Sequence, residues 1–307
     1  VPDSSGVPSG CTADTLSAIY NHLDSVEQLF QQYPSEIACV IVEPVAANMG
    51  VVLPESNFLS GLRQICDRYG ALLIFDEVIT GFRLQLDGAI GYFGVTPDLV
   101  TYGKIIGGGM PVGAYGGRKE IMQLVAPLGS VYQAGTLSGN PVAMCAGITQ
   151  LRYLQAHPEV YQQIRGLSDR FRNGLKEIIQ RYHAPCTVNG MESLSCLYFT
   201  SKPVTNYASA KQADTQQFRQ YFHYMLDAGS YFGPSQFEAI FVSNAKHYPM
   251  QKLILQHKRK NKYLTNIERG EHYETGNGIS GGSRTRGSAL ADRTRQTVLT
   301  GSGCCCL

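Results

Sequence analysis

The sequence predicts an α/β protein in which a mostly parallel central sheet is flanked by helices and followed by a smaller C-terminal α/β unit. Short apolar runs alternate with longer amphipathic segments, a pattern typical of strands joined by crossover helices. Two of these runs end directly in a carboxylate, at Glu43 and Asp76. Because the carboxyl ends of parallel strands face ligands, both acids indicate a binding site at one sheet edge.

The composition is that of an ordinary globular protein, with 307 residues, 43% hydrophobic and 16% charged. No apolar run approaches the roughly 20 residues of a membrane span. Residues from Gln251 onward hold ten of the 26 basic and four of the 24 acidic residues, so the body before them is mildly acidic. We therefore expect neither a membrane nor a nucleic acid as partner.

The first two predicted elements are a short helix and a strand. Asp24 and Glu27 form a capping-box pattern, which predicts a helix over residues 24–33. The apolar run over residues 37–42 predicts a buried strand with Glu43 at its carboxyl end.

The next predicted helix covers residues 58–69 and stops at Gly70. The strand after it, over residues 72–75, ends in Asp76. A strand, a helix and a strand in this order form a right-handed parallel unit. Glu43 and Asp76 should therefore lie on the same edge of one sheet.

Two further strands are expected at residues 99–102 and 113–116, after a loop over 81–94 that returns the chain across the sheet. Lys104 follows the first of them, among apolar residues and glycines. Such surroundings predict a buried lysine with a lowered pKa and a nucleophilic amine. Taken singly, Lys104 is more typical of a structural lysine in a turn, and Asp76 is equally typical of a turn cap. Together they indicate pyridoxal phosphate chemistry.

The second half is predicted to be mostly helical at first and mixed afterwards. Helices are expected at 140–154, 161–182 and 215–226, and strands at 194–200 and 239–242. We divide the chain into a large cofactor-binding unit over residues 1–154, a small unit over 155–247, and a basic tail over 248–307 that is predicted to be disordered. Six scattered cysteines are predicted to be reduced core residues: Cys11, Cys39, Cys66, Cys145, Cys186 and Cys196.

Four segments resemble the class III aminotransferases, which depend on pyridoxal phosphate. They cover residues 42–50, 75–83, 103–117 and 133–141. Parts of these segments, together with residues 234–238, are most similar to the aminomutase branch of the family. The resemblance extends from about residue 1 to about residue 246. It implies the type I fold of pyridoxal-phosphate transferases, with pyridoxal 5′-phosphate as cofactor and its pyridoxamine 5′-phosphate form within the cycle.

The resemblance implies a role for each residue near the ring. Lys104 would attach covalently to the cofactor and move protons. Asp76 would pair with the pyridinium nitrogen, and Val78 would pack against one ring face. Asn48 would lie near the ring 3-oxygen.

Four residues lie further from the ring or have open roles. The segment with Gly135 and Thr136 would bind the phosphate of the neighbouring subunit's cofactor. Glu238 matches a carboxylate that distinguishes the aminomutases, although an exposed strand-end glutamate is an equally good reading from the residues alone. Glu43 is predicted either to act in the site or to orient its polar neighbours.

The resemblance implies an enzyme that exchanges amino and oxo groups within one five-carbon substrate and yields 5-aminolevulinate for tetrapyrrole synthesis. It further implies a homodimer, transfer of substrate from glutamyl-tRNA reductase, and a bacterial cytoplasm or a plastid stroma as location. Family members carry a long N-terminal portion, with a phosphate-binding loop and a ring-stacking aromatic, that this sequence does not contain. An ordinary class III aminotransferase and a non-catalytic fragment therefore remain as alternatives.

Overall fold

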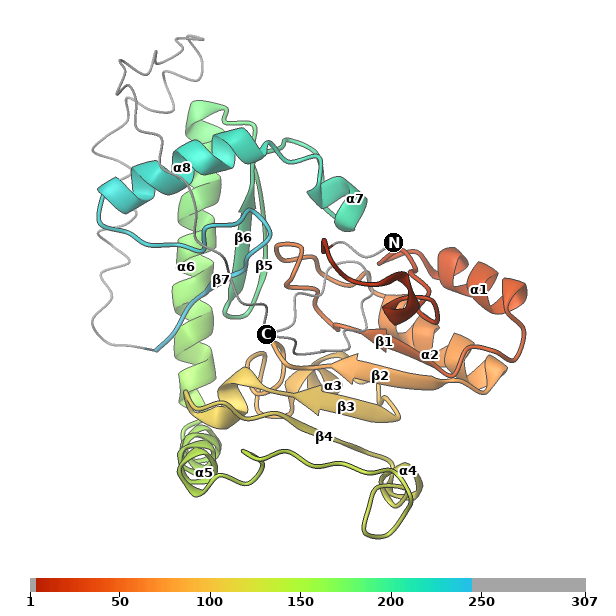
Figure 1. Cartoon of the computed structure of the whole chain (residues 1–307). Helices are drawn as coiled ribbons and strands as arrows, with labels where there is room; N and C mark the ends of the chain where they lie inside the picture. Colours follow the sequence, from red (N-terminus) through yellow and green to blue (C-terminus); the bar gives the residue numbers. More distant parts are fainter. Residues whose placement is uncertain (1–3, 245–307) are drawn as a thin grey trace, which may run out of the picture.

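The computed structural model describes residues 4–244, which form two sheets and the helices around them (Figure 1). The strands are β1 (Cys39–Val42), β2 (Leu72–Asp76), β3 (Leu99–Tyr102), β4 (Ala114–Gly117), β5 (Thr187–Met191), β6 (Leu194–Tyr198) and β7 (Ile240–Phe241). The α-helices are α1 (Leu23–Gln32), α2 (Phe58–Tyr69), α3 (Gly88–Phe93), α4 (Lys119–Met122), α5 (Pro141–Ala156), α6 (Glu159–Tyr182), α7 (Tyr207–Ala210) and α8 (Thr215–Asp227). Short 3-10 helices occur at η1 (Ser9–Cys11) and η2 (Lys104–Gly107). The predicted tail over residues 248–307 lies outside this range.

The first sheet has the strand order β1-β2-β3-β4. β1, β2 and β3 run parallel, and β4 runs antiparallel to β3, which confirms the prediction of a mostly parallel sheet. Helix α2 forms the crossover between β1 and β2. It ends where predicted because Gly70 takes a φ of 70°, a left-handed conformation that glycine adopts without a steric penalty.

Helices α1 and α2 bury the core of this sheet on one side. Val26 and Phe30 of α1 and Leu62 of α2 pack in one cluster with Phe75 of β2. Burying one such side chain contributes about 1.5–3 kcal/mol. Because side chains alternate along a strand, Asp76 points to the other face from Phe75. The apolar cluster therefore fixes the direction in which the carboxylate leaves the strand.

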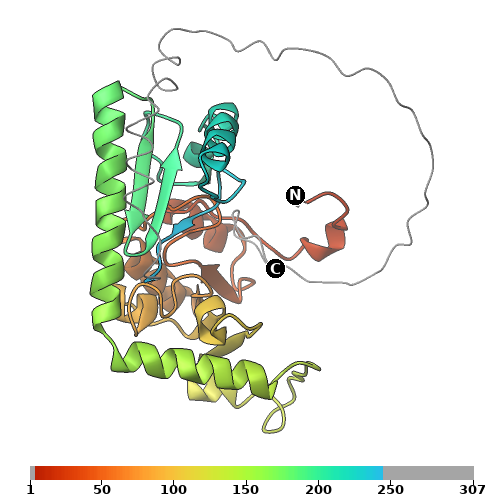
Figure 2. The same ribbon diagram turned by 90° about the vertical axis from the view of Figure 1, so that its left-hand side faces the viewer.

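The second sheet has the order β5-β6-β7, and all its pairs are antiparallel. Figure 2 shows α6 running beside β5 and β6, with α5 leading into one end of α6. β6 is buried on both faces. Leu197 packs with Tyr221 and Met225 of α8, whereas Leu194 and Tyr198 join a cluster with the loop that follows β1. The two sheets are therefore linked by a shared apolar core.

The helix predicted over residues 24–33 is present as α1, but its predicted cap was wrong, and so was the prediction of a loop over residues 81–94. Helix α1 is capped by His22, whose side chain accepts a hydrogen bond from the Ser25 amide at 3.0 Å, and Asp24 lies inside the first turn. The expected loop over residues 81–94 contains α3. Glu77, eleven residues before the start of α3, accepts from the Ala89 amide at 2.6 Å. Such a distant cap leaves no local sequence signal.

The cysteine prediction is only partly confirmed. Cys66 and Cys196 are buried and Cys186 is half-buried, but Cys11, Cys39 and Cys145 are exposed. All six are free thiols. Cys39 is exposed because it begins β1, the edge strand of the first sheet in the described residues.

Asp98 joins α2, β2 and the residue before α4. Its carboxylate accepts from the Leu73 amide and from Arg63, both at 2.7 Å, and from Arg118 at 2.9 Å. Burial acts to raise the pKa of this carboxyl. The hydrogen bonds from Leu73, Arg63 and Arg118 outweigh that effect and hold the pKa below its usual value. A carboxyl with a lowered pKa in the folded state stabilises the fold above the unfolded pKa of about 3.9, and this stabilisation is lost as the pH falls through the folded pKa.

We expect Asp98→Asn to lower the free energy of unfolding at pH 7 by about 3 kcal/mol, because it removes the buried charge that pairs with Arg63 and Arg118. The variant should also lose less stability than the parent between pH 6 and pH 3. Urea unfolding at a series of pH values measures both effects. Asp67→Asn, which removes an exposed partner of the same Arg63, is the matched control and should cost less than about 1 kcal/mol. Equal losses in the two variants would contradict the central role of Asp98.

Across residues 4–244, none of the helices combines the length and the apolar character that crossing a membrane requires.

Candidate active site

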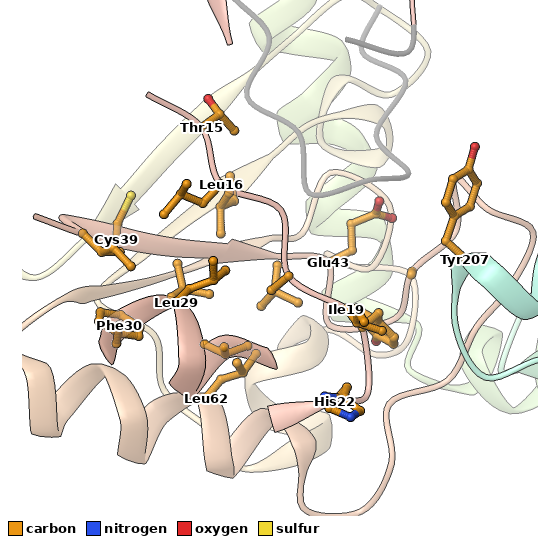
Figure 3. A pocket seen from close by; sticks show the side chains of 18 of the residues that line it. Thr15, Leu16, Ile19, His22, Leu29, Phe30, Cys39, Glu43, Leu62 and Tyr207 are labelled. Atoms are coloured by element: carbon orange, nitrogen blue, oxygen red, sulfur yellow. The ribbon is translucent and has the colours of Figure 1, made fainter. Parts of the chain in front are cut away.

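The site begins where the parallel strands of the first sheet end. Val42 of β1 pairs with Phe75 of β2, so the next residues, Glu43 and Asp76, lie side by side at the same edge of the sheet. The prediction that both acids lie at one sheet edge is confirmed. Both line a cavity of about 810 Å³. Figure 3 shows Glu43 at the carboxyl end of β1 with its carboxylate directed away from the strand.

Asp76 is held by its neighbours in the sheet. It lies opposite Thr101 of β3. Its Oδ1 accepts from the Val78 amide at 3.1 Å and, at the longer distance of 3.4 Å, from the Thr101 hydroxyl. These donors fix the side-chain orientation, so the carboxylate is presented from a rigid position. Thr101 was not predicted as a site residue, since only its register with Asp76 shows its role.

Lys104 lies three residues after Thr101, at the exit from β3. Its φ is 49°, in the left-handed region that few residues other than glycine adopt. Strain of this kind costs on the order of 1–3 kcal/mol and is concentrated at functional sites. The backbone therefore holds Lys104 in an unfavourable conformation next to the strand that carries the partner of Asp76.

The prediction that Lys104 is buried was wrong for the described residues, where it is exposed. The turn that follows it lies against α5. Ile106 is buried. A Cβ placed on Gly147 of α5 would overlap the carbonyl oxygen of Ile106. The apolar residues after Lys104 thus pack against α5 and do not enclose the amine.

Val78 lies beside the same turn. A Cβ placed on Gly103, directly before Lys104, would come within 3.2 Å of Val78 Cγ1. The turn after Asp76 and the turn after β3 are therefore in contact, which brings Val78, Asp76 and the lysine-bearing turn into one region.

Glu43 positions Asn48. One carboxylate oxygen, Oε1, accepts from Asn48 Nδ2 at 2.9 Å, and Oε2 accepts from the Ala47 amide at 2.9 Å. Of the two readings of Glu43 from the sequence, these contacts favour the one in which it orients polar neighbours. Burial raises the pKa of the nearby Tyr20 hydroxyl well above its usual value, and the charge of Glu43 acts in the same direction.

The loop that carries Asn48 is also fixed from the second sheet. The Tyr198 hydroxyl donates to the Met49 carbonyl at 2.9 Å, and the Gly50 amide donates to the Phe237 carbonyl at 2.7 Å. Gly50 has a φ of 79°, and a Cβ there would overlap the Tyr198 ring. Only glycine satisfies both requirements. Tyr198 of β6 and Phe237, which precedes β7, thus hold the loop that follows β1.

Glu77, which directly follows Asp76, is a supporting residue that sequence reasoning missed. It is fully buried and accepts from the Thr80 hydroxyl at 3.1 Å in addition to the Ala89 amide. Burial raises the pKa of this carboxyl. Its bonds anchor the turn between Asp76 and α3. The sequence signal that could have indicated Glu77 is its position directly beside Asp76, as the second of two adjacent acids.

Of the eight predicted site residues, only two line the cavity, Glu43 and Asp76. The other six do not: Lys104, Val78, Asn48, Gly135, Thr136 and Glu238. Gly135 and Thr136 lie on an exposed segment that leads to α5. Glu238 is also exposed, and its side chain would contact a Cβ placed on Gly233. Its neighbour Phe237 accepts the hydrogen bond from Gly50, so the Glu238 turn is connected to the Asn48 loop. The roles of all eight predicted site residues stay predictions.

Comparison with known proteins identifies the family. A model of the class III aminotransferases matches residues 6–245. Glutamate-1-semialdehyde 2,1-aminomutase 2 of Lachnoclostridium phytofermentans is 62% identical over 81% of this chain and 58% of its own length. The aminomutase of Ruminiclostridium cellulolyticum is 58% identical over 81% of this chain and 57% of its own length. The chain therefore spans somewhat more than half the length of these relatives.

Solved structures agree in fold. An omega-transaminase from Sphaerobacter thermophilus superposes with a TM-score of 0.76 at 31% identity, covering 83% of this chain and 58% of that protein. A glutamate-1-semialdehyde aminomutase from Pseudomonas aeruginosa shares the fold with a TM-score of 0.72 at 24% identity, covering 83% of this chain and 59% of that protein. The chain therefore belongs to the class III aminotransferases.

Proposed function

We propose that this chain provides the lysine-bearing part of a pyridoxal-phosphate-dependent glutamate-1-semialdehyde 2,1-aminomutase. The observation that carries the proposal is the juxtaposition at one sheet edge of Asp76, held by Val78 and Thr101, with the strained turn of Lys104. The names of relatives up to 62% identical favour the aminomutase over an ordinary aminotransferase. The product of the proposed reaction is 5-aminolevulinate, the precursor of tetrapyrroles.

The residues present fit the cofactor of the family. Pyridoxal phosphate, when bound, supplies an electron sink for the bonds around the amino-bearing carbon. Asp76 offers a fixed carboxylate that would hold the proton of the pyridine nitrogen. Val78 offers an apolar surface for one ring face, and Asn48, oriented by Glu43, offers a polar group for the ring 3-oxygen.

Lys104 is the one of these residues suited to move protons. Its primary amine can bind a carbonyl group covalently, and when released it can accept a proton at one substrate carbon and deliver it at another. An exchange of amino and oxo groups within one molecule requires both operations. Glu238, on the turn connected to Gly50, would supply the carboxylate that distinguishes aminomutases from aminotransferases.

Supplying the chain with pyridoxal phosphate and then glutamate-1-semialdehyde tests the proposal. Stoichiometric binding with an absorbance band of a lysine adduct, followed by formation of 5-aminolevulinate, is the expected result. Cofactor binding together with amino transfer from 4-aminobutyrate to 2-oxoglutarate, without 5-aminolevulinate, would favour an ordinary aminotransferase. An absence of cofactor binding would favour a non-catalytic fragment, because the chain spans only part of its relatives.

The proposal includes a homodimer formed through the segment around the start of α5. This segment exposes several large apolar side chains, as an interaction surface does: Leu124, Leu128, Val131, Tyr132, Leu137 and Val142. Leu137 follows Thr136 directly. A second copy covering this surface would bring Thr136 to its own cofactor phosphate.

We expect the double change Tyr132→Asp and Leu137→Asp to shift the protein from dimer to monomer in sedimentation velocity at micromolar concentration. These side chains are 84% and 70% exposed in the isolated chain, so charges there should not disturb its core. Tyr231→Asp, at a 72% exposed tyrosine of the small unit, is the control and should leave the dimer intact. A monomeric parent, or a dimer that survives the double change, would contradict this assignment.

Two further parts of the proposal concern partners and location. Glutamyl-tRNA reductase is proposed as the enzyme that hands over the semialdehyde. Bacterial cytoplasm is preferred to plastid stroma as location, because the relatives named above are bacterial.

A further inference from the structure

The turn between β2 and α3 carries an arginine that no acid neutralises. Arg83 is half-buried, and its guanidinium carbon lies 4.4 Å from the centroid of the Phe241 ring in β7. Its Nε donates to the Ile79 carbonyl at 3.0 Å. Across residues 4–244, no carboxylate pairs with this guanidinium, and its two terminal nitrogens, Nη1 and Nη2, have no hydrogen-bond partner.

The other arginines in comparable surroundings are paired. In the part of the chain that the structure describes, three arginines are buried or half-buried: Arg63, Arg83 and Arg172. Arg63 pairs with Asp98 and Arg172 with Asp169, each at 2.7 Å. Buried charges in proteins are normally paired, because the desolvation of an ion is costly. Burial lowers the pKa of Arg83 to about 10, with no carboxylate to oppose this shift. Arg83 therefore lacks the counter-charge that the other two have.

Three other elements hold the turn that carries Arg83. The preceding residue, Phe82, has a φ of 56°, and its ring centroid lies 5.5 Å from that of Tyr102 in β3. The Phe82 carbonyl accepts from the Tyr161 hydroxyl of α6 at 3.0 Å. Phe241 of β7 supports the guanidinium itself. Because the side chain is already held in place, a ligand that binds it has little left to order.

The contacts of Arg83 leave one edge of the guanidinium for a ligand. Nε is bonded to Ile79, and Phe241 covers one face, so the edge formed by Nη1 and Nη2 remains. Two parallel N–H groups match the two oxygens of a carboxylate. One guanidinium does not balance the charge of a phosphate dianion. Phe241, which is 45% exposed, offers an apolar surface for the rest of the molecule. We propose that Arg83 and Phe241 form a binding site for a small organic carboxylate.

The site lies where the turn after Asp76 contacts the strand after Glu238. Arg83 follows Asp76 within the turn that leads to α3, and Phe241 belongs to β7, which begins shortly after Glu238. A bound carboxylate would neutralise the guanidinium at this contact. The binding depends on neither the cofactor nor the proposed reaction.

The test uses the full 307-residue chain without cofactor, near neutral pH. The probe is pentanoate, and its uncharged isostere pentanamide is the matched control. NMR chemical shifts of the backbone amides of Arg83 and Phe241 follow the titration. We expect saturable shifts with a dissociation constant on the order of 10 mM, as suits one charge-assisted pair of hydrogen bonds. Pentanamide should bind at least about tenfold more weakly, and inorganic phosphate no more tightly than pentanoate.

Three variants test the assignment to Arg83. Arg83→Gln removes the charge and the pair of parallel N–H groups, so the affinity for pentanoate should fall at least about tenfold. Because this change removes a charge that burial disfavours, the fold should persist. Arg83→Lys keeps the charge but not the parallel N–H groups, and should bind at least about threefold more weakly than the parent. Arg219→Gln, at an exposed arginine of α8, is the matched control and should stay within about twofold of the parent.

Four results would overturn the proposal. The first is an absence of shifts at Arg83 and Phe241 up to about 50 mM pentanoate. The second is equal affinity for pentanoate and pentanamide, a comparison that needs no variant. The third is an affinity of Arg83→Gln equal to that of the parent. The fourth is tighter binding of inorganic phosphate than of pentanoate, which would assign the site to another anion. None of these measurements involves cofactor or turnover, so a failed catalytic proposal gives a different pattern.

Discussion

Replacing Lys104 with arginine should lower turnover of the enzyme containing this chain by about 10⁴-fold or more. Arginine keeps the positive charge but cannot form a Schiff base, and it does not release a proton near neutral pH. Both steps assigned to the amine are therefore lost together. Pyridoxamine 5′-phosphate, which needs no covalent bond to the protein, should still bind the variant. Single-turnover kinetics and equilibrium dialysis measure these two properties separately.

The matched control is Lys119→Arg on the exposed helix α4, which should leave turnover within about twofold. Borohydride reduction of the complex with pyridoxal phosphate should fix the label on the peptide that contains Lys104. Because Lys104 is exposed in the described residues, its selectivity rests on its position near Asp76 and not on burial. A label on Lys119, or near-normal turnover of Lys104→Arg, would show that the lysine has been assigned wrongly.

The elements predicted best were those whose signals are local. Helix α2 was located to the residue because its apolar face and the terminating Gly70 lie next to each other in the sequence. The bounds of β3 and the start of α5 after Asn140 were predicted equally well. The Asn140 side chain caps α5 by accepting hydrogen bonds from the Val142 and Ala143 amides. The order of strand, helix and strand then placed Glu43 and Asp76 at one edge.

The features that sequence reasoning missed depend on contacts between distant residues. Glu77 caps α3 across a turn. The role of Glu43 was left open between two readings, because no periodicity reveals that its side chain points to Asn48. β5 was missed because its residues are half-buried and lack alternation. The burial of Lys104 was overestimated because apolar neighbours in sequence were assumed to surround it in space, whereas Ile106 packs against α5.

Asp76 provides the prediction with the second largest expected effect. Asp76→Asn should lower turnover by about 10²- to 10⁴-fold while leaving thermal stability nearly unchanged. The asparagine oxygen can still accept from the Val78 amide and the Thr101 hydroxyl, so the turn keeps its hydrogen bonds. What is lost is the negative charge that would keep the pyridine nitrogen protonated and the ring electron-poor.

A cofactor analogue separates this electrostatic role from a structural one. Pyridoxal phosphate methylated at the pyridine nitrogen carries a permanent positive charge, so it should restore at least about tenfold of the turnover lost in Asp76→Asn. Thr101→Val, which removes only the longer of the two hydrogen bonds to Asp76, is the matched control and should stay within about tenfold of the parent. If Asp76→Asn retained turnover within about threefold of the parent, Asp76 would be the cap of its turn and no more. In that case the acid would stabilise the chain reversal between β2 and α3, and the ring nitrogen would need a different partner.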